Sequence, residues 1–266
     1  MRNFKLPDLP ERTARPREEG ITMVMDKGLN LRQTADWVDA WDEYADIVKL
    51  GFGTALLTRD LKKKLDLYRE AGIKTYFGGT LFEAFIVRDM FDDYRRLLSK
   101  YKVEYAEVSD GSIQMPHKEK CRYIKELSRD FTVLSEVGSK EAGVIIYPKR
   151  WISMMNKEIA SGAWKVITES RESGNVGIYR PNGNAHTALI AKILGNVPKE
   201  KILWEAPNKA QQAWFIDLLG TNVNLGNISP DDVIPLETLR IGLRGDTFKQ
   251  FMPKGKRAEA ERKEKA

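Results

Sequence analysis

Residues 222–247 read NVNLGNISPDDVIPLETLRIGLRGDT, and this stretch contains the pattern on which the fold depends. Polar Asn alternates with apolar Val and Leu up to Gly226-Asn227, as in a short β-strand. A proline-led segment of helical character follows, with spaced arginines at 240 and 244. Similar units, each a β-branched or aromatic run followed by a helical segment, recur about eight times along the chain. The stretch is therefore one unit of a repeating architecture.

Eight candidate strands follow one another at similar spacing. They are residues 21–26, 46–51, 73–78, 104–110, 131–138, 165–170, 202–206 and 222–227. The segments between them have the periodicity of amphipathic helices, for example RQTADWVDAWDEY at 32–44. Strands and helices that alternate in this way predict parallel βαβ units. Eight such units in about 250 residues predict an α/β fold, a closed (β/α)8 TIM barrel with a parallel eight-stranded wall.

No low-complexity linker interrupts the series, so we expect one barrel domain at residues 21–252. A loosely attached N-terminal arm at residues 1–20 and a charged, disordered tail at 253–266 complete the predicted organisation. The longest apolar runs are far shorter than the roughly 20 residues of a membrane span, and the N-terminus has no apolar signal region. The single cysteine, Cys121, fits a reducing compartment. We therefore expect a soluble, cytoplasmic protein with no membrane partner.

The net charge of +6 raises the question of nucleic-acid binding. The last fourteen residues hold six basic and three acidic side chains, so half of the excess lies in the tail. The tail contains no aromatic residue, and single-stranded nucleic-acid sites depend on interleaved aromatics. We therefore expect no nucleic-acid partner. Aromatic residues on the predicted helices, such as Trp37 and Trp214, indicate helix packing and favour a homo-oligomer.

Polar and charged residues recur where the predicted strands end. In a (β/α)8 barrel the carboxyl ends of all strands face one mouth, where such enzymes build their sites. In chain order these residues are Asp26 and Lys27, Lys49, Gly78 to Thr80 with Glu83, Ser109 and Asp110, Glu136 and Lys140, Glu169 and Arg171, Glu205, and Asn224 with Asn227. The sequence thus predicts one polar rim, to which the quoted stretch is the eighth contributor.

Five cations interspersed with carboxylates on this rim predict a site for a small polyanion together with a divalent cation. The cations are Lys27, Lys49, Lys140, Arg171 and Arg244. Lys and Arg bind phosphate or carboxylate oxygens, and one or two carboxylates suffice for Mg²⁺. Lys49 interrupts an apolar strand, which favours a functional role over a structural ion pair. Three successive apolar runs end in a glutamate: Glu136, Glu169 and Glu205. These glutamates are either residues of the site or members of salt bridges that stabilise the rim.

Other motifs are weaker or exclude whole classes of site. Gly79 belongs to a Gly-Gly pair between a strand and a helix, where free amides can bind an anion but tight turns are also common. The chain has neither a complete GxGxxG fingerprint nor a GxxxxGK[ST] loop. Its histidines, His117 and His186, and Cys121 do not have zinc-site spacing.

An ordered series of nine motifs between about residues 20 and 248 resembles the (2R)-phospho-3-sulfolactate synthase family of coenzyme M biosynthesis. The motifs are MDKG, VKLGFGT, GGTLFE, VSDGSI, SEVGSK, ESRESG, EAPNKAQQ, NVNLGNI and LETLRIGLRGDTF. The resemblance implies a (β/α)8 barrel and Mg²⁺-dependent addition of sulfite to phosphoenolpyruvate, a lyase reaction that forms a carbon–sulfur bond.

The resemblance also implies roles for individual residues. Lys140 matches the lysine of the family's EVGxK pattern and is the expected general acid at C2 of phosphoenolpyruvate. Lys27, Lys49 and Arg171 become anion-binding candidates, together with Gly79, Asn224 and Arg244 from the rim. Glu136, Glu169 and Glu205 are the candidate metal ligands, with no order among them.

Some features depart from the family or leave alternatives open. Ser170 stands where members of this family often have glycine, beside an expected anion site. The family includes stress-associated members, so a non-catalytic barrel scaffold that works through partners is an alternative. A barrel enzyme that acts on another phosphorylated acid or sugar is a second.

Overall fold

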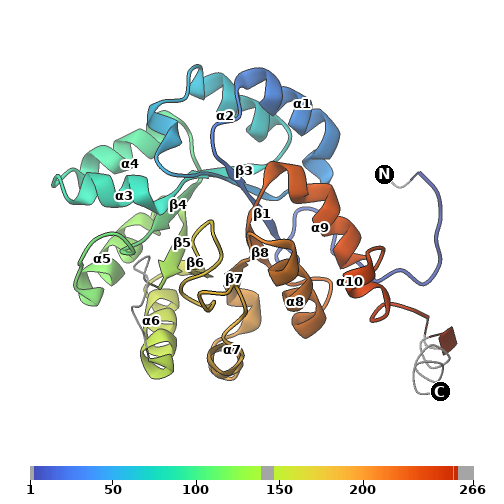
Figure 1. Ribbon diagram of the computed structural model, residues 1–266. Coiled ribbons are helices and arrows are strands. Elements are labelled where there is room, and N and C mark those ends of the chain that lie inside the picture. The colour runs from blue at the N-terminus through green and yellow to red at the C-terminus, as the bar shows by residue number, and fades with distance from the viewer. Residues whose placement is uncertain (1–2, 139–146, 254, 257–266) are drawn as a thin grey trace.

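Eight parallel strands alternate with helices in the computed structural model, which describes residues 3–138, 147–253 and 255–256 (Figure 1). The strands are β1 (Thr22–Asp26), β2 (Ile47–Leu50), β3 (Lys74–Phe77), β4 (Tyr105–Val108), β5 (Thr132–Val137), β6 (Ala163–Thr168), β7 (Ile202–Glu205) and β8 (Leu225–Ile228). Their side chains are almost all buried, because one face of each strand meets the barrel interior and the other meets a helix. The predicted α/β barrel is confirmed.

The strands form one sheet in the order β3-β2-β1-β8-β7-β6-β5-β4, so the wall is nearly closed between β3 and β4. Residues of β3 and β4 still contact one another across this seam. A side chain also links the two sides, since Glu107 of β4 accepts a hydrogen bond of 2.7 Å from the backbone N–H of Gly79, just after β3. The seam therefore ends in a charged group at the mouth.

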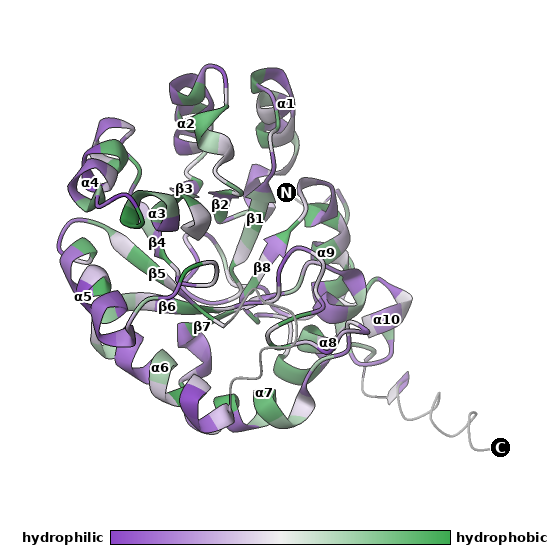
Figure 2. Cartoon of the chain, turned by 60° about the vertical axis from the view of Figure 1, so that its left-hand side comes forward, coloured by the Kyte–Doolittle hydropathy of each residue, from purple (hydrophilic) through white to green (hydrophobic). Residues whose placement is uncertain are grey.

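The helices surround the strands. They are α1 (Leu31–Trp41), α2 (Leu61–Glu70), α3 (Gly79–Ile86), α4 (Phe91–Lys100), α5 (His117–Leu127), α6 (Pro148–Ala160), α7 (Thr187–Leu194), α8 (Lys209–Leu219), α9 (Val233–Arg240) and α10 (Gly245–Phe248), with short 3₁₀ turns η1 (Asp42–Tyr44), η2 (Thr54–Leu56), η3 (Lys199–Lys201) and η4 (Pro230–Asp232). Hydrophobic and hydrophilic residues alternate along the outer helices, as amphipathic packing requires (Figure 2). Among the described residues, no helix is both long enough and apolar enough to cross a membrane.

Capping and aromatic packing fix individual helices. Asn30 begins α1 with a capping box that includes Gln33, and its side chain accepts from the Gln33 N–H at 2.9 Å. Trp37 of α1 is buried and donates to the Pro230 carbonyl at 3.0 Å, so α1 is bound to the far end of the chain. The predicted packing role of Trp37 is confirmed, whereas a homo-oligomer stays a prediction.

Three arginines attach the N-terminal arm to the end of the barrel opposite the mouth. Arg12 pairs with Glu237 at 3.0 Å, and Arg17 pairs with Asp46 at 3.0 Å. Arg15 donates to the Asp42 carbonyl at 2.7 Å. All three arginines therefore bind residues of the barrel, while the predicted division into arm, barrel and tail stays a prediction.

The start of β8 also differs from expectation. The alternation of NVNLGN predicted a strand at 222–227, but the strand begins at Leu225. Asn224 therefore precedes the strand, and Asn227 lies near its end.

Candidate active site

A cavity of about 350 Å³ opens at the carboxyl ends of the strands, as expected for this fold. Its lining comes from strand ends around the whole barrel, from Met25 of β1 to Asn227 of β8. The charged residues of the lining are Lys49, Glu107, Glu136, Glu169, Arg171, Glu172 and Glu205. The sequence had placed most of these side chains on one rim, and the structure brings them around one space.

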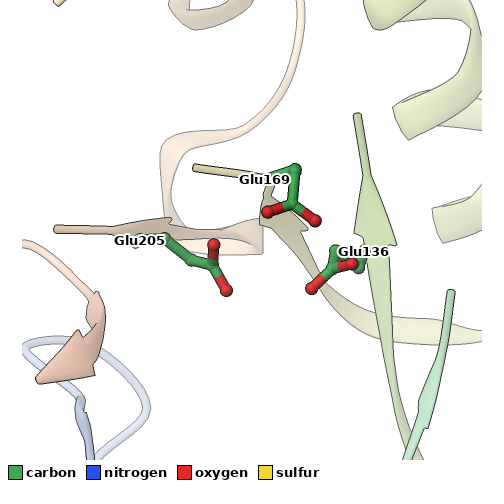
Figure 3. A group of neighbouring side chains, drawn as sticks. All are labelled: Glu136, Glu169 and Glu205. Carbon is green, nitrogen blue, oxygen red and sulfur yellow. The ribbon is translucent and has the colours of Figure 1, made fainter. Parts of the chain in front are cut away.

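Three carboxylates converge in this cavity from consecutive strands. Glu136 lies in β5, Glu169 directly follows β6, and Glu205 ends β7. One oxygen from each lies within 4.8 Å of the others, and Figure 3 shows the three side chains turned toward a common space. All three are at most 3 % exposed. Oxygen ligands this close and this buried form a group that could hold a divalent cation.

The turn after β6 orients two of these carboxylates. The N–H of Ser170 donates to Glu205 Oε2 at 2.9 Å, and the single hydroxyl proton of Ser170 has two acceptors in reach, the Arg171 carbonyl at 2.9 Å and the same Glu205 oxygen at 3.2 Å. The N–H of Arg171 donates to Glu169 Oε1 at 2.6 Å. Arg171 has a φ of +55°, a left-handed conformation that a non-glycine residue rarely adopts. Residue 170 thus helps to fix Glu205 through its backbone N–H, a bond that glycine would also make, and the serine hydroxyl adds a second donor beside it.

Lys49 lies at the floor of the cavity among carboxylates. Its Nζ is 3.1 Å from Glu107 Oε2, 3.5 Å from Glu136 Oε2 and 3.6 Å from Glu205 Oε1. Lys49 and Glu107 are both almost fully buried. Lys49 is therefore part of a buried charge network and also lines the site, which combines the two interpretations that its sequence context allowed.

Glu107 is a residue of the site that the sequence reasoning missed. A signal was present, because Glu107 interrupts the apolar run YAEV just as Lys49 interrupts IVKL. A charged residue inside a buried strand is costly unless it is paired. Two such residues, Lys49 and Glu107, on different strands of one barrel therefore indicate a buried ion pair.

Burial and mutual repulsion set the protonation of the network. Burial lowers the pKa of Lys49, but the surrounding acidic groups, with Glu107 the largest contributor, raise it by more than burial lowers it. The pKa of Lys49 therefore lies well above its usual value. Burial raises the pKa of Glu205 to about 7; Lys49 opposes this shift, and repulsion from Glu136 and Glu107 adds to it. Among the described residues, Lys49 has three carboxylate neighbours, and Glu169 lines the same cavity, so this part of the site gathers acidic oxygens that suit a cation.

Gly79 lines the cavity, but its backbone N–H is already bonded to Glu107. A Cβ at this position would lie 2.4 Å from Ser109 Oγ and 2.5 Å from Glu107 Oε1. The glycine is therefore explained by close packing at the seam.

Lys27 and Arg244 lie outside the lining. Lys27 is exposed and pairs with Glu172, which itself lines the cavity. Arg244 is half-buried at the start of α10. Lys140 lies outside the described residues.

Asn224 lies at the opposite end of the barrel from the mouth. Its Oδ1 accepts from the Ile21 N–H at 3.1 Å, and its Nδ2 donates to the Ile202 carbonyl at 3.1 Å. Both partners belong to the amino ends of neighbouring strands. Asn227, three residues later, lines the cavity instead.

Comparisons with known proteins agree with the motif series. Residues 10–246 match the family model described as (2R)-phospho-3-sulfolactate synthase (ComA). A phosphosulfolactate synthase of Bacillus subtilis (strain 168) is 41% identical over 251 residues, covering 93% of this chain and 99% of the relative. Phosphosulfolactate synthases of Methanothermobacter thermautotrophicus and Methanocaldococcus jannaschii are each 40% identical, covering 90% and 87% of this chain and 95% and 94% of the respective relatives.

Solved structures with low sequence identity share the fold. A 3-keto-L-gulonate-6-phosphate decarboxylase from Vibrio cholerae aligns with a TM-score of 0.53 at 11% identity, covering 88% of this chain and 100% of that one. The YdjI aldolase from Escherichia coli K12 aligns with a TM-score of 0.52 at 11% identity, covering 88% and 90%. At this identity the likeness extends to the barrel architecture.

Proposed function

The chain belongs to the (2R)-phospho-3-sulfolactate synthase family, and from that membership we propose that it adds sulfite to phosphoenolpyruvate to form (2R)-2-O-phospho-3-sulfolactate. The observation that carries the proposal is the buried group of Glu136, Glu169 and Glu205 beside Lys49, at the mouth of a barrel that matches the family over most of its length. The proposal makes the protein a cytoplasmic carbon–sulfur lyase of the type used in coenzyme M biosynthesis.

We also propose that the three glutamates hold Mg²⁺. The residues fit this ion, since Mg²⁺ takes oxygen ligands and uses one or two carboxylates together with substrate oxygens. Their oxygens are already within 4.8 Å of one another without a change in the backbone. Bound Mg²⁺ would supply positive charge that lowers the repulsion between two anionic substrates and stabilises negative charge on the phosphoenolpyruvate carboxylate.

Arg171 and Lys27 are the candidates for binding substrate oxygens. Arg171 lines the cavity, and its guanidinium makes no ion pair with the residues that the structure describes. A guanidinium can bind a phosphate or carboxylate with two parallel hydrogen bonds. Lys27 pairs with Glu172 in an exposed position. Exposed pairs contribute little free energy, so an anionic ligand can replace Glu172 as the partner of Lys27.

The proposed reaction forms one bond and transfers one proton. The sulfur lone pair of sulfite forms a bond to C3 of phosphoenolpyruvate, and the electrons of the C2–C3 double bond move toward the carboxylate. C2 then takes up a proton, so that the phosphate ester stays intact. Lys140, outside the described residues, remains the predicted donor of this proton. Lys49 has a raised pKa and three carboxylate neighbours, so its role is to stabilise the acidic wall of the cavity.

Phosphorus NMR tests the proposal directly. The purified protein with phosphoenolpyruvate, sulfite and Mg²⁺ is expected to produce a new phosphoester resonance while the phosphoenolpyruvate resonance declines. Samples with EDTA and samples without sulfite are the controls, and neither should form the product. An unchanged spectrum from folded protein would contradict the proposal and favour another phosphorylated substrate or a non-catalytic scaffold.

A further inference from the structure

Strand β8 contains a bulge at the mouth of the barrel. Its pairing with β1 passes from Thr22↔Leu225 to Val24↔Ile228, so three steps along β8 oppose two steps along β1. Within this bulge Asn227 has a φ of +56°. The left-handed region is sterically unfavourable for most residues, and asparagine is among the few that tolerate it. The backbone of β8 is therefore distorted at one particular side chain.

The bulge turns Asn227 into the cavity. Gly226 pairs with Glu205 on β7, and a Cβ at Gly226 would meet Met23 Cε at 2.7 Å and Leu203 Cγ at 3.5 Å, which shows that this position faces the barrel interior. Strict alternation would then direct residue 227 outward, toward the helices. Asn227 instead lines the cavity and is 6% exposed. Bulges next to active sites commonly redirect a side chain in this way.

The redirected side chain has a hydrogen-bonding group without a partner. Asn227 Oδ1 is buried, and it accepts no hydrogen bond from the residues that the structure describes. Buried acceptors in proteins are nearly always satisfied, so an exception calls for a ligand or another functional reason. Backbone strain and an unsatisfied acceptor at one residue both indicate a side chain held for binding.

The surroundings identify the chemistry of that ligand. Glu136, Glu169 and Glu205 come from β5, β6 and β7, and Asn227 continues the series on β8. Asn227 lines the same cavity, and its unpartnered amide oxygen carries partial negative charge that repels anionic oxygens and attracts a cation. We propose that Asn227 Oδ1 is a further, neutral oxygen ligand of the divalent cation, an inference that rests on the cation site of the proposed function. A neutral ligand adds coordination without adding to the negative charge that anionic substrates already meet.

Binding of Mn²⁺, a spectroscopic substitute for Mg²⁺, tests the inference without requiring turnover. Electron paramagnetic resonance titrations would compare the wild type with Asn227→Gly and Asn227→Asp. Glycine removes the side chain and tolerates the left-handed backbone, and we expect the Kd for Mn²⁺ to rise about 10-fold or more. Aspartate keeps the shape and adds a charge, so the Kd for Mn²⁺ should not rise, while the KM for phosphoenolpyruvate should.

Asn224→Ala is the matched control, because Asn224 is also a buried amide of the β8 region but bonds backbone groups at the other end of the barrel. This variant should lose stability and keep the wild-type Kd for Mn²⁺. A wild-type Kd in Asn227→Gly would overturn the inference, as would a raised Kd in Asn227→Asp, the variant that preserves side-chain shape.

The titrations and the phosphorus spectra separate the two proposals. A protein that binds Mn²⁺ through Asn227 but leaves phosphoenolpyruvate unchanged with sulfite refutes the reaction and supports the ligand. Product formation together with wild-type Mn²⁺ binding in Asn227→Gly refutes the ligand and supports the reaction.

Discussion

At the scale of single residues, the cavity depends on the charge of Lys49. Its ammonium group lies within 3.6 Å of carboxylate oxygens from β4, β5 and β7. Removing one partner of a buried ion pair leaves the other charge uncompensated, which costs more than the pair itself contributes. Lys49 thus allows acidic residues that suit a cation to remain in a folded barrel before any cation binds.

Lys49→Met should therefore lower the free energy of unfolding by about 3–5 kcal/mol at neutral pH. The loss should be smaller near pH 5, where the carboxylates accept protons more easily. Urea denaturation followed by circular dichroism measures both values. Lys62→Met is the control, because Lys62 forms an exposed pair with Asp66 one helical turn away, and its loss should change stability by about 0.5 kcal/mol or less. A similarly small change for Lys49→Met would show that the network does not depend on this charge.

At the scale of secondary-structure elements, a second buried network joins α5, α6 and β5 behind the site. Lys120 of α5 donates to the backbone carbonyl of Glu136 at 2.5 Å and pairs with Glu158 of α6 at 3.1 Å and with Asp110 at 2.9 Å. Ser135 donates to the other oxygen of Glu158 at 2.5 Å. The outer helices therefore hold the strand segment that carries the Glu136 carboxylate.

Glu158 gives this network a defined pH dependence. Burial raises the pKa of Glu158, but Lys120, His117 and Ser135 together lower it by more than burial raises it. The pKa of Glu158 in the folded protein is therefore below its usual value of 4.5. The unfolded chain then binds the proton more tightly than the folded chain. The stabilisation by Glu158 is complete above about pH 4.5 and is lost as the pH falls through the folded-state pKa.

Glu158→Gln should lower the free energy of unfolding at pH 7 by an amount on the order of 3 kcal/mol. The difference between wild type and variant should shrink as the pH falls below about 4.5. Denaturation curves at several pH values measure this difference. Glu126→Gln is the control, because Glu126 is a partly exposed partner of Arg122 within α5. A difference that stays constant down to pH 3 would contradict the assignment of the charge to Glu158.

At the scale of the whole molecule, the two ends of the barrel have separate tasks. The mouth contains the carboxylates and the cavity, whereas the opposite end is covered by the arm through Arg12, Arg15 and Arg17. Asp46 also accepts a hydrogen bond of 2.9 Å from the Thr22 N–H, so the arm is connected to β1 through its ion-pair partner. Stability and binding can thus be changed at different ends of the same barrel.

Removal of residues 1–17 should therefore destabilise the protein while leaving the mouth intact. The deletion leaves the largely buried carboxylates of Glu237 and Asp46 without their arginine partners. We therefore expect the free energy of unfolding to fall by at least about 3 kcal/mol. Thermal unfolding measures the loss, and Mn²⁺ binding by the folded protein should be unchanged. Removal of residues 1–8 alone should have little effect, because residues 3–8 are exposed. Weakened Mn²⁺ binding in the folded, longer deletion would contradict the separation of the two ends.

The sequence by itself determined the architecture and most of the rim. Strand and helix periods are local properties, and eight units in series have few ways to bury their apolar faces other than a barrel. A barrel directs all strand ends to one mouth, so the sequence alone places Glu136, Glu169, Glu205, Lys49 and Arg171 at the cavity. Their roles as ligands remain predictions.

Tertiary structure decided which of the remaining residues reach the cavity. Glu107 joins the site through pairing with Lys49 across the seam, a long-range contact that local periodicity does not encode. Asn224 and Asn227 look alike in NVNLGN, yet one bonds backbone groups at the closed end and the other lines the mouth. Asn224 precedes β8, and the bulge within β8 turns Asn227 into the cavity, because one extra residue in a strand reverses which side chains face inward. The register of a strand is set by its neighbours in the sheet, and for that reason only the folded chain reveals it.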